Sequence, residues 1–166
     1  MSKINITKAK VLNKEIAISY YVLNEEGKKI KYEVTDNSEP HKDLKDSMDS
    51  LSAHAAFIAE FIDANEFKSA KKSKGVLEKY PVKGFSLSGE DNDNIMINAQ
   101  KQLSTGEMLG FNTPSRSLDT EAEEPYPFAE DLQKYLDKCI DELREYLNGK
   151  HAPKPQLAME FDENNR

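Results

Sequence analysis

The chain contains no tryptophan and a single cysteine, Cys139, among its 166 residues. One cysteine excludes an internal disulfide, and residues 1–30 lack the charged and apolar regions of a secretory signal, so the sequence predicts a cytoplasmic protein. No apolar run approaches the roughly 18 residues that a membrane-spanning helix needs. We therefore expect a cytoplasmic protein that makes no contact with a membrane.

Glycine and histidine are too few and too scattered to form a familiar cofactor site. The seven glycines make neither the GxGxxG nor the GxxxxGK[ST] pattern that cradles phosphates. Zinc needs three or four close nitrogen, sulfur or oxygen ligands, and the chain offers one cysteine and three distant histidines. We expect no cofactor and no metal at these histidines, His41, His54 and His151.

Pairs of acidic residues are the remaining candidates for a catalytic site. Asp91 and Asp93 lack the later glutamate that an EF-hand calcium loop requires. Close pairs such as Asp36 with Glu39, or Asp43 with Asp46, could hold magnesium, as in nucleases, but thirty acids make such pairs common by chance. The sequence therefore favours a non-enzymatic protein, with a folded-together carboxylate site as the alternative.

Charge is distributed unevenly along the chain. The net charge is −7, yet residues 1–83 carry 15 basic and 13 acidic side chains, whereas residues 84–166 carry 8 and 17. An acidic total argues against a protein that coats duplex DNA, but it leaves room for a local basic surface.

Hydrophobic periodicity predicts an α+β fold. Alternating apolar residues predict six short strands, and two amphipathic stripes, over residues 44–62 and 128–147, predict two helices in the order βββα-βββα. A mainly antiparallel sheet with both helices on one face would bury both stripes. We expect residues 1–149 to form one domain and residues 150–166 to form a tail.

A lysine-rich segment, residues 66–83, lies between the first helix and the fourth strand. It holds six lysines against two glutamates, with Phe67 and Tyr80 among them. Lysines beside aromatic rings suit single-stranded nucleic acid, whose phosphates need cations and whose bases stack on rings. The alternative is an exposed, solvated connection. The candidate nucleic-acid-binding residues are Lys68, Lys71, Lys72, Lys74 and Tyr80.

A second charged segment, residues 117–131, has six acids and no base, and two prolines interrupt it. These prolines prevent a continuous helix, so we expect a loop. The loop either solvates a connection or presents a negative surface to a basic partner.

Apolar residues reappear in the polar C-terminal tail, after Gly149 and two prolines. They either form a last strand at the sheet edge or belong to a short linear motif that folds on contact with a partner. The segment QLAMEF, residues 156–161, resembles the bacterial sliding-clamp-binding peptide. This resemblance implies that Gln156 is a polar anchor, that Met159 and Phe161 fill a hydrophobic pocket on the clamp, and that Leu157 is accessory.

The chain as a whole is similar in style to small proteins of bacteriophages and prophages. The matching segments are a serine-to-proline helix start (Ser-Glu-Pro here), an NTP segment, a PF-initiated last helix and its terminal GK, at residues 38–40, 112–114, 127–128 and 149–150. The resemblances imply an accessory protein of phage DNA replication or recombination that binds single-stranded DNA or a replication protein and is recruited to the host sliding clamp. The alternative is a phage inhibitor that sequesters part of a host defence system.

Overall fold

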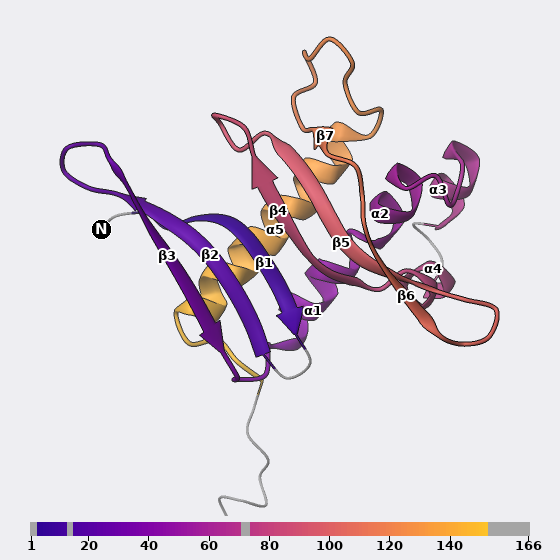
Figure 1. Cartoon of the computed structure of the whole chain (residues 1–166), viewed down its shortest axis with the longest axis horizontal. Coiled ribbons are helices and arrows are strands. Elements are labelled where there is room, and N and C mark those ends of the chain that lie inside the picture. Colours follow the sequence, from indigo (N-terminus) through magenta and orange to yellow (C-terminus); the bar gives the residue numbers. More distant parts are fainter. Residues whose placement is uncertain (1–2, 13–14, 71–73, 153–166) are drawn as a thin grey trace, which may run out of the picture.

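The computed structural model describes residues 3–12, 15–70 and 74–152 and has a mixed α+β architecture (Figure 1). Its antiparallel sheet has the strand order β3-β2-β1-β4-β5-β6, and the short β7 pairs with β5. The strands are β1 Asn5–Leu12, β2 Glu15–Leu23, β3 Lys29–Asp36, β4 Val82–Ser88, β5 Asn94–Gln102, β6 Met108–Asn112 and β7 Arg116–Ser117. The α+β class and the antiparallel sheet predicted from alternation are confirmed.

Two three-strand meanders meet at the centre of the sheet, where β1 pairs with β4. Lys10 lies opposite Gly84 in this pairing, and a Cβ atom built on Gly84 would lie 2.2 Å from the Ala9 carbonyl oxygen. Only glycine allows the two backbones to come this close. The junction between the meanders therefore depends on this one residue.

Helices cover one face of the sheet and leave the other face open. The helix α5, Ala129–Leu147, crosses behind the strands in Figure 1, and α1, Lys42–Asp49, packs beside it on the same side. Side chains of alternate strand residues meet the apolar stripe of α5 there, because successive strand residues point to opposite faces. The fully buried members include Ile16, Ile18, Ile95, Ile97, Leu132, Leu136, Cys139 and Leu143.

The prediction of two helices is wrong, since the described residues contain five. The stripe over residues 44–62 is divided into α1 and α2, Ser52–Ile58, although Leu44, Met48 and Leu51 are buried as the spacing predicts. The Ser50 hydroxyl donates to the Ser47 carbonyl at the division. Such a side-chain bond competes with the helical backbone and marks the interruption.

The lysine-rich segment, interpreted from the sequence either as a binding surface or as an exposed connection, was not predicted to be helical. It contains α3, Ala64–Ala70, and α4, Lys74–Lys79. Phe67 and Ala70 are buried with Ala53 of α2 in a small second cluster. The helices form because the segment has apolar positions at helical spacing that this cluster covers.

The chain after α5 returns to the start of α1. The Pro40 and His151 backbones form an antiparallel bridge, and the Ala152 amide donates to the Glu39 carbonyl at 2.8 Å. Lys150 Nζ lies 2.8 Å from an Asp43 carboxylate oxygen. The first residues assigned to the tail thus contact the folded body, whereas Gln156, Leu157, Met159 and Phe161 lie outside the described residues. No helix in the described ranges is both long and apolar enough to span a membrane.

Candidate nucleic-acid interface

The open face of the sheet carries side chains of β1, β2 and β3. Ile16 and Ile18 point into the core, so Ser19 and Tyr21 of β2 point to the open face. Residues directly opposite one another on paired strands share a face. The register then places four lysines and two acids on the same open face as Ser19 and Tyr21, namely Lys8, Lys10, Lys29, Lys31, Glu15 and Glu33.

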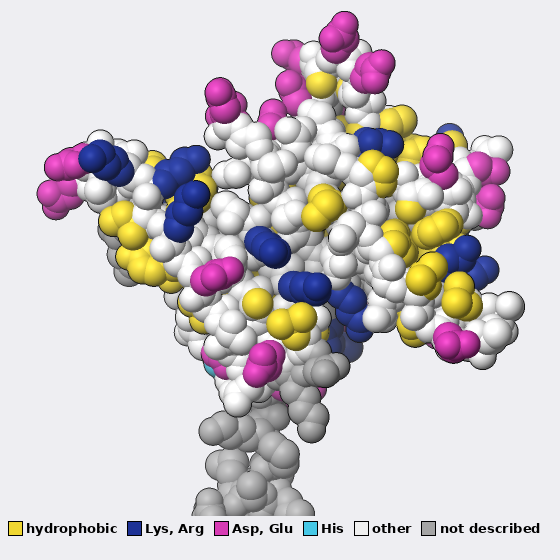
Figure 2. All heavy atoms as spheres, in the orientation of Figure 1, with side chains coloured by type: hydrophobic (Ala, Val, Ile, Leu, Met, Phe, Trp, Pro, Cys, Tyr) yellow, Lys and Arg dark blue, Asp and Glu magenta, His cyan; other side chains and the backbone are white. Residues whose placement is uncertain are grey.

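These four lysines, here called the open-face lysines, form no ion pair with another described residue. Lys29 Nζ instead lies 4.6 Å from the centre of the Tyr21 ring. The net charge of the whole chain is −7, so this face contrasts with the rest of the molecule. In Figure 2 dark blue side chains lie over the β2–β3 arm and the middle of the face, while magenta ones lie mainly at the tips of turns and loops.

A hollow of about 500 Å³ adjoins this lysine-bearing surface. The Asn92 side-chain amide, from the turn between β4 and β5, donates to the Tyr21 hydroxyl at 3.4 Å. The hollow therefore combines an aromatic ring, amide and hydroxyl groups, and cations. Its lining includes Thr7, Ser19, Tyr21, Lys29, Lys31, Glu33, Leu87 and Asn92.

The second meander continues the open face with neutral polar groups. Asn98 of β5 and Asn112 of β6 lie opposite one another, and the Asn98 amide donates to the Asn112 side-chain oxygen at 2.8 Å. Ser86, Met96 and Gln100 share the same face by register. None of these residues of β4, β5 and β6 is acidic. They would therefore not repel a polyanion that lay across the strands.

The candidate residues of the lysine-rich segment are not all exposed, as nucleic-acid binding by this segment would require. Tyr80 is only 4% exposed, and its ring lies 5.8 Å from that of Phe61 in a stacked arrangement. Burial raises the pKa of the Tyr80 hydroxyl. The ring is therefore not a platform for a base. Lys68 is exposed on α3, Lys71 and Lys72 lie outside the described residues, and Lys74 is described only as part of the α4 backbone.

A buried polar network, which the sequence analysis missed, joins α2 to the start of α5. His54 is fully buried, and its Nδ1 and Nε2 atoms lie 2.8 Å from the Tyr126 hydroxyl and from an Asp131 carboxylate oxygen. Burial, and secondarily the Asp131 charge, raise the pKa of Tyr126. Rings of Phe57, Phe67 and Phe128 surround this network. Seventy-two residues separate His54 from Tyr126, so no local spacing could reveal the contact.

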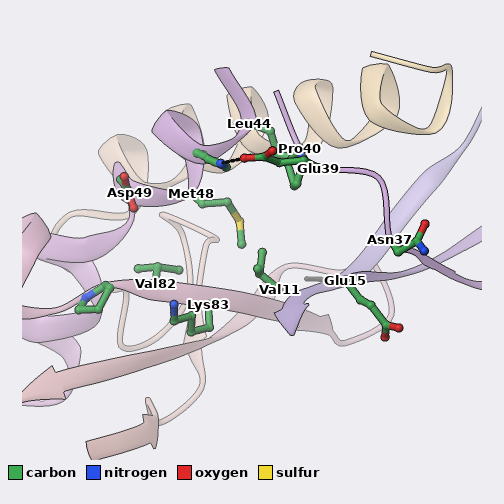
Figure 3. Close-up of a pocket in the computed structure, with 12 residues that line it drawn as sticks. Val11, Glu15, Asn37, Glu39, Pro40, Leu44, Met48, Asp49, Val82 and Lys83 are labelled. Atoms are coloured by element: carbon green, nitrogen blue, oxygen red, sulfur yellow. Dashed lines mark hydrogen bonds and ion pairs between the residues drawn. The ribbon is translucent and has the colours of Figure 1, made fainter. Parts of the chain in front are cut away.

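A cavity of about 650 Å³ lies between α1 and the strands β1 and β4 (Figure 3). Its apolar lining includes Val11, Met48 and Val82, while Asp49 stands on the α1 side and Lys83 on the β4 side. Burial raises the pKa of the Asp49 carboxyl, and the Asp46 charge adds to this shift. Asp49 and Lys83 lie on opposite walls, and two further charged residues of the lining, Glu39 and Lys45, pair with each other at 2.9 Å.

The acid pairs considered for magnesium are engaged elsewhere. Asp43 bonds to Lys150 at 2.8 Å, and Asp46 bonds to Lys42 at 3.0 Å. The Asp36 carboxylate accepts the Ser38 amide, and this bond lowers the pKa of Asp36. Across the described ranges, no group of three or more histidine, cysteine or acidic side chains is placed to hold a metal ion.

No protein-family model, curated protein or solved structure matches this chain with significant similarity. No residue role therefore comes from a relative. Of the surfaces described above, the open face alone combines accessible cations with an aromatic ring and a hollow beside it.

Proposed function

We propose that this protein binds single-stranded nucleic acid on the open face of its sheet, as a non-enzymatic accessory of phage DNA replication or recombination. The observation that carries this proposal is the set of four open-face lysines beside Tyr21, on a protein whose net charge is −7. Lysines that form no ion pair within the described part of an acidic protein are a local attraction for a polyanion.

Each part of the face has a role in this proposal. The open-face lysines neutralise phosphates, and the Tyr21 ring stacks with one base. Asn92 lines the hollow and offers an amide to the edge of that base. A duplex keeps its bases stacked inside, so it would use the lysines but leave Tyr21 and the hollow unused. The face therefore suits a single strand better than a duplex.

The C-terminal segment would recruit the protein to the host sliding clamp. Its resemblance to the sliding-clamp-binding peptide assigns Gln156, Met159 and Phe161 to contacts with the host clamp, with Leu157 as an accessory. A clamp-bound protein would be held next to the strand that it binds, which raises the local concentration of the open face. The setting is the cytoplasm of the bacterial host.

The proposal is tested by fluorescence anisotropy with a labelled oligonucleotide of mixed sequence. One variant replaces all four open-face lysines by alanine, and its matched control replaces the lysines of the predicted segment, Lys68, Lys71, Lys72 and Lys74, by alanine. We expect the first variant to lose binding and the control to retain it. The reverse pattern would move the interface to the helical segment, and no binding by the wild-type chain would reject the proposal.

A second candidate function depends on the loop between β7 and α5, which projects from the body in Figure 1. Its four acids, Asp119, Glu121, Glu123 and Glu124, are exposed. This loop would present a negative surface to a basic effector of a host defence system and sequester it. Replacing the four acids by their amides should then abolish capture of that effector and leave oligonucleotide binding unchanged. Equal capture by both forms would remove this candidate.

A further inference from the structure

The strand β3 forms an exposed edge of the sheet. It lies at one end of the strand order in Figure 1, pairs with β2 alone among the described strands, and has six exposed residues out of eight. A regular edge of this length is a template for pairing with a further strand. The strand at the other end of the order, β6, is shorter and carries no charged side chain. Charge could therefore select a partner at β3 but not at β6.

The outward backbone groups of β3 belong to its odd-numbered residues. The Asn24 amide donates to the Lys28 carbonyl where the β2–β3 hairpin closes, so Lys28 and the even-numbered residues after it bond to β2. Lys29, Lys31 and Glu33 therefore direct their N–H and C=O groups away from the sheet. If a second copy of β3 paired with the first in the antiparallel sense, odd-numbered residues would have to face odd-numbered residues.

One such register of two β3 strands pairs opposite charges. With Tyr32 opposite Tyr32 of the second copy, Lys31 of each copy lies opposite Glu33 of the other. Neither Lys31 nor Glu33 forms an ion pair with a described residue of its own chain. Moving the register by two residues would place Lys31 opposite Lys31, or Glu33 opposite Glu33. Since like charges directly opposite one another are destabilising, the register centred on Tyr32 is favoured.

The same register brings apolar side chains together on the face of β3 that points to the helix side of the sheet. Ile30 lies opposite Val34 of the second copy, on either side of the central Tyr32 pair. Ile30 is 43% and Tyr32 44% exposed, and the Tyr32 ring stacks on Tyr20 of β2 with 5.1 Å between ring centres. Aromatic and β-branched pairs across strands stabilise a sheet. Both faces of β3 therefore favour one register.

We infer that two copies of this chain pair through β3 as an antiparallel, twofold-symmetric dimer with Tyr32 at the axis. The two sheets join into one, and each copy covers the exposed edge of the other. Both open faces lie on the same side of the joined sheet, because residues directly opposite one another share a face. A contact along one strand is small, so the dimer dissociates on dilution. Lys31 is then available to phosphate in dilute oligonucleotide titrations.

Charge reversal in the full chain tests this interface, by sedimentation velocity over a concentration series. Lys31→Glu leaves acids at residues 31 and 33, and Glu33→Lys leaves lysines at both. Each variant alone should therefore have a dimer dissociation constant about tenfold or more above that of the wild type. An equimolar mixture of the two should dimerise again, since each acid would face a lysine. The matched control, Lys68→Glu on α3, makes the same charge change and should keep the wild-type constant.

Recovery of the dimer in the mixture would also show that both variants are folded. A wild-type chain that stays monomeric across the series would overturn the inference and leave the β3 edge to another partner. Dimers that persist in both single variants would place the contact elsewhere, and a mixture that stays monomeric would reject this register. No nucleic acid or clamp enters the experiment, so its outcome is independent of the proposed function.

Discussion

Removal of Lys8 and Lys10 should weaken oligonucleotide binding and reduce its dependence on salt. Both side chains lie on the open face of β1. The variant Lys8→Ala with Lys10→Ala removes two of the four open-face lysines without removing a buried group. The matched control, Lys68→Ala with Lys79→Ala, removes the same charge from exposed positions on α3 and α4.

The magnitude follows from the number of lysines. Each phosphate neutralised on a single strand contributes about 0.7 to the slope of log affinity against log salt, so four lysines give a slope near ~2.8. Raising salt from about 50 to about 200 mM then lowers the wild-type affinity about 50-fold. Two lysines give a slope near ~1.4 and a loss of only about 7-fold over the same range.

The assay is anisotropy of a labelled single-stranded oligonucleotide, titrated with each protein at four salt concentrations. The control variant should keep the wild-type slope, since its charge change lies away from the open face. A wild-type slope near zero would show that phosphate contacts do not drive binding. A control slope that falls as much as that of the β1 variant would show that net charge, rather than this face, determines the affinity.

Two further predictions concern the buried network and the sheet junction. Tyr126→Phe removes a hydroxyl bonded to buried His54 and should cost about 1–3 kcal/mol of unfolding free energy in urea titrations, whereas Tyr32→Phe, at an exposed site, should cost far less. Gly84→Ala drives a methyl group into the Ala9 carbonyl and should cost on the order of 3 kcal/mol in the same assay; an unchanged midpoint would refute the close approach.

Local patterns account for most of the sheet. Alternation at Ile16 and Ile18 predicted both the strand and its buried face, because a two-residue period leaves only one face to cover. The stripe of α5 was equally informative, since Leu132, Leu136 and Leu143 are all buried. Breaks within helical segments were not predicted, because the apolar spacing of α1 and α2 continues across their boundary.

The candidate interface could not be located in the same way. Lysines adjacent in sequence drew attention to α3 and α4, whereas the open-face lysines come from two strands and meet only through the pairing of β1 and β3 with β2. Tyr80 looked like a stacking residue because it lies among lysines, but Phe61 covers its ring. A register between strands is a long-range property, and the position of Tyr21 beside Lys29 follows from it.

Photochemical crosslinking tests the central claim most directly, namely that the open face of the sheet contacts single-stranded nucleic acid. An oligonucleotide carrying iodouracil at successive positions is irradiated with the wild-type chain, and the crosslinked peptide is identified by mass spectrometry. We expect a crosslink to Tyr21 of β2, the tyrosine that lies beside the open-face lysines. Crosslinks confined to residues 64–80, or to the tail, with none on β1, β2 or β3, would contradict it.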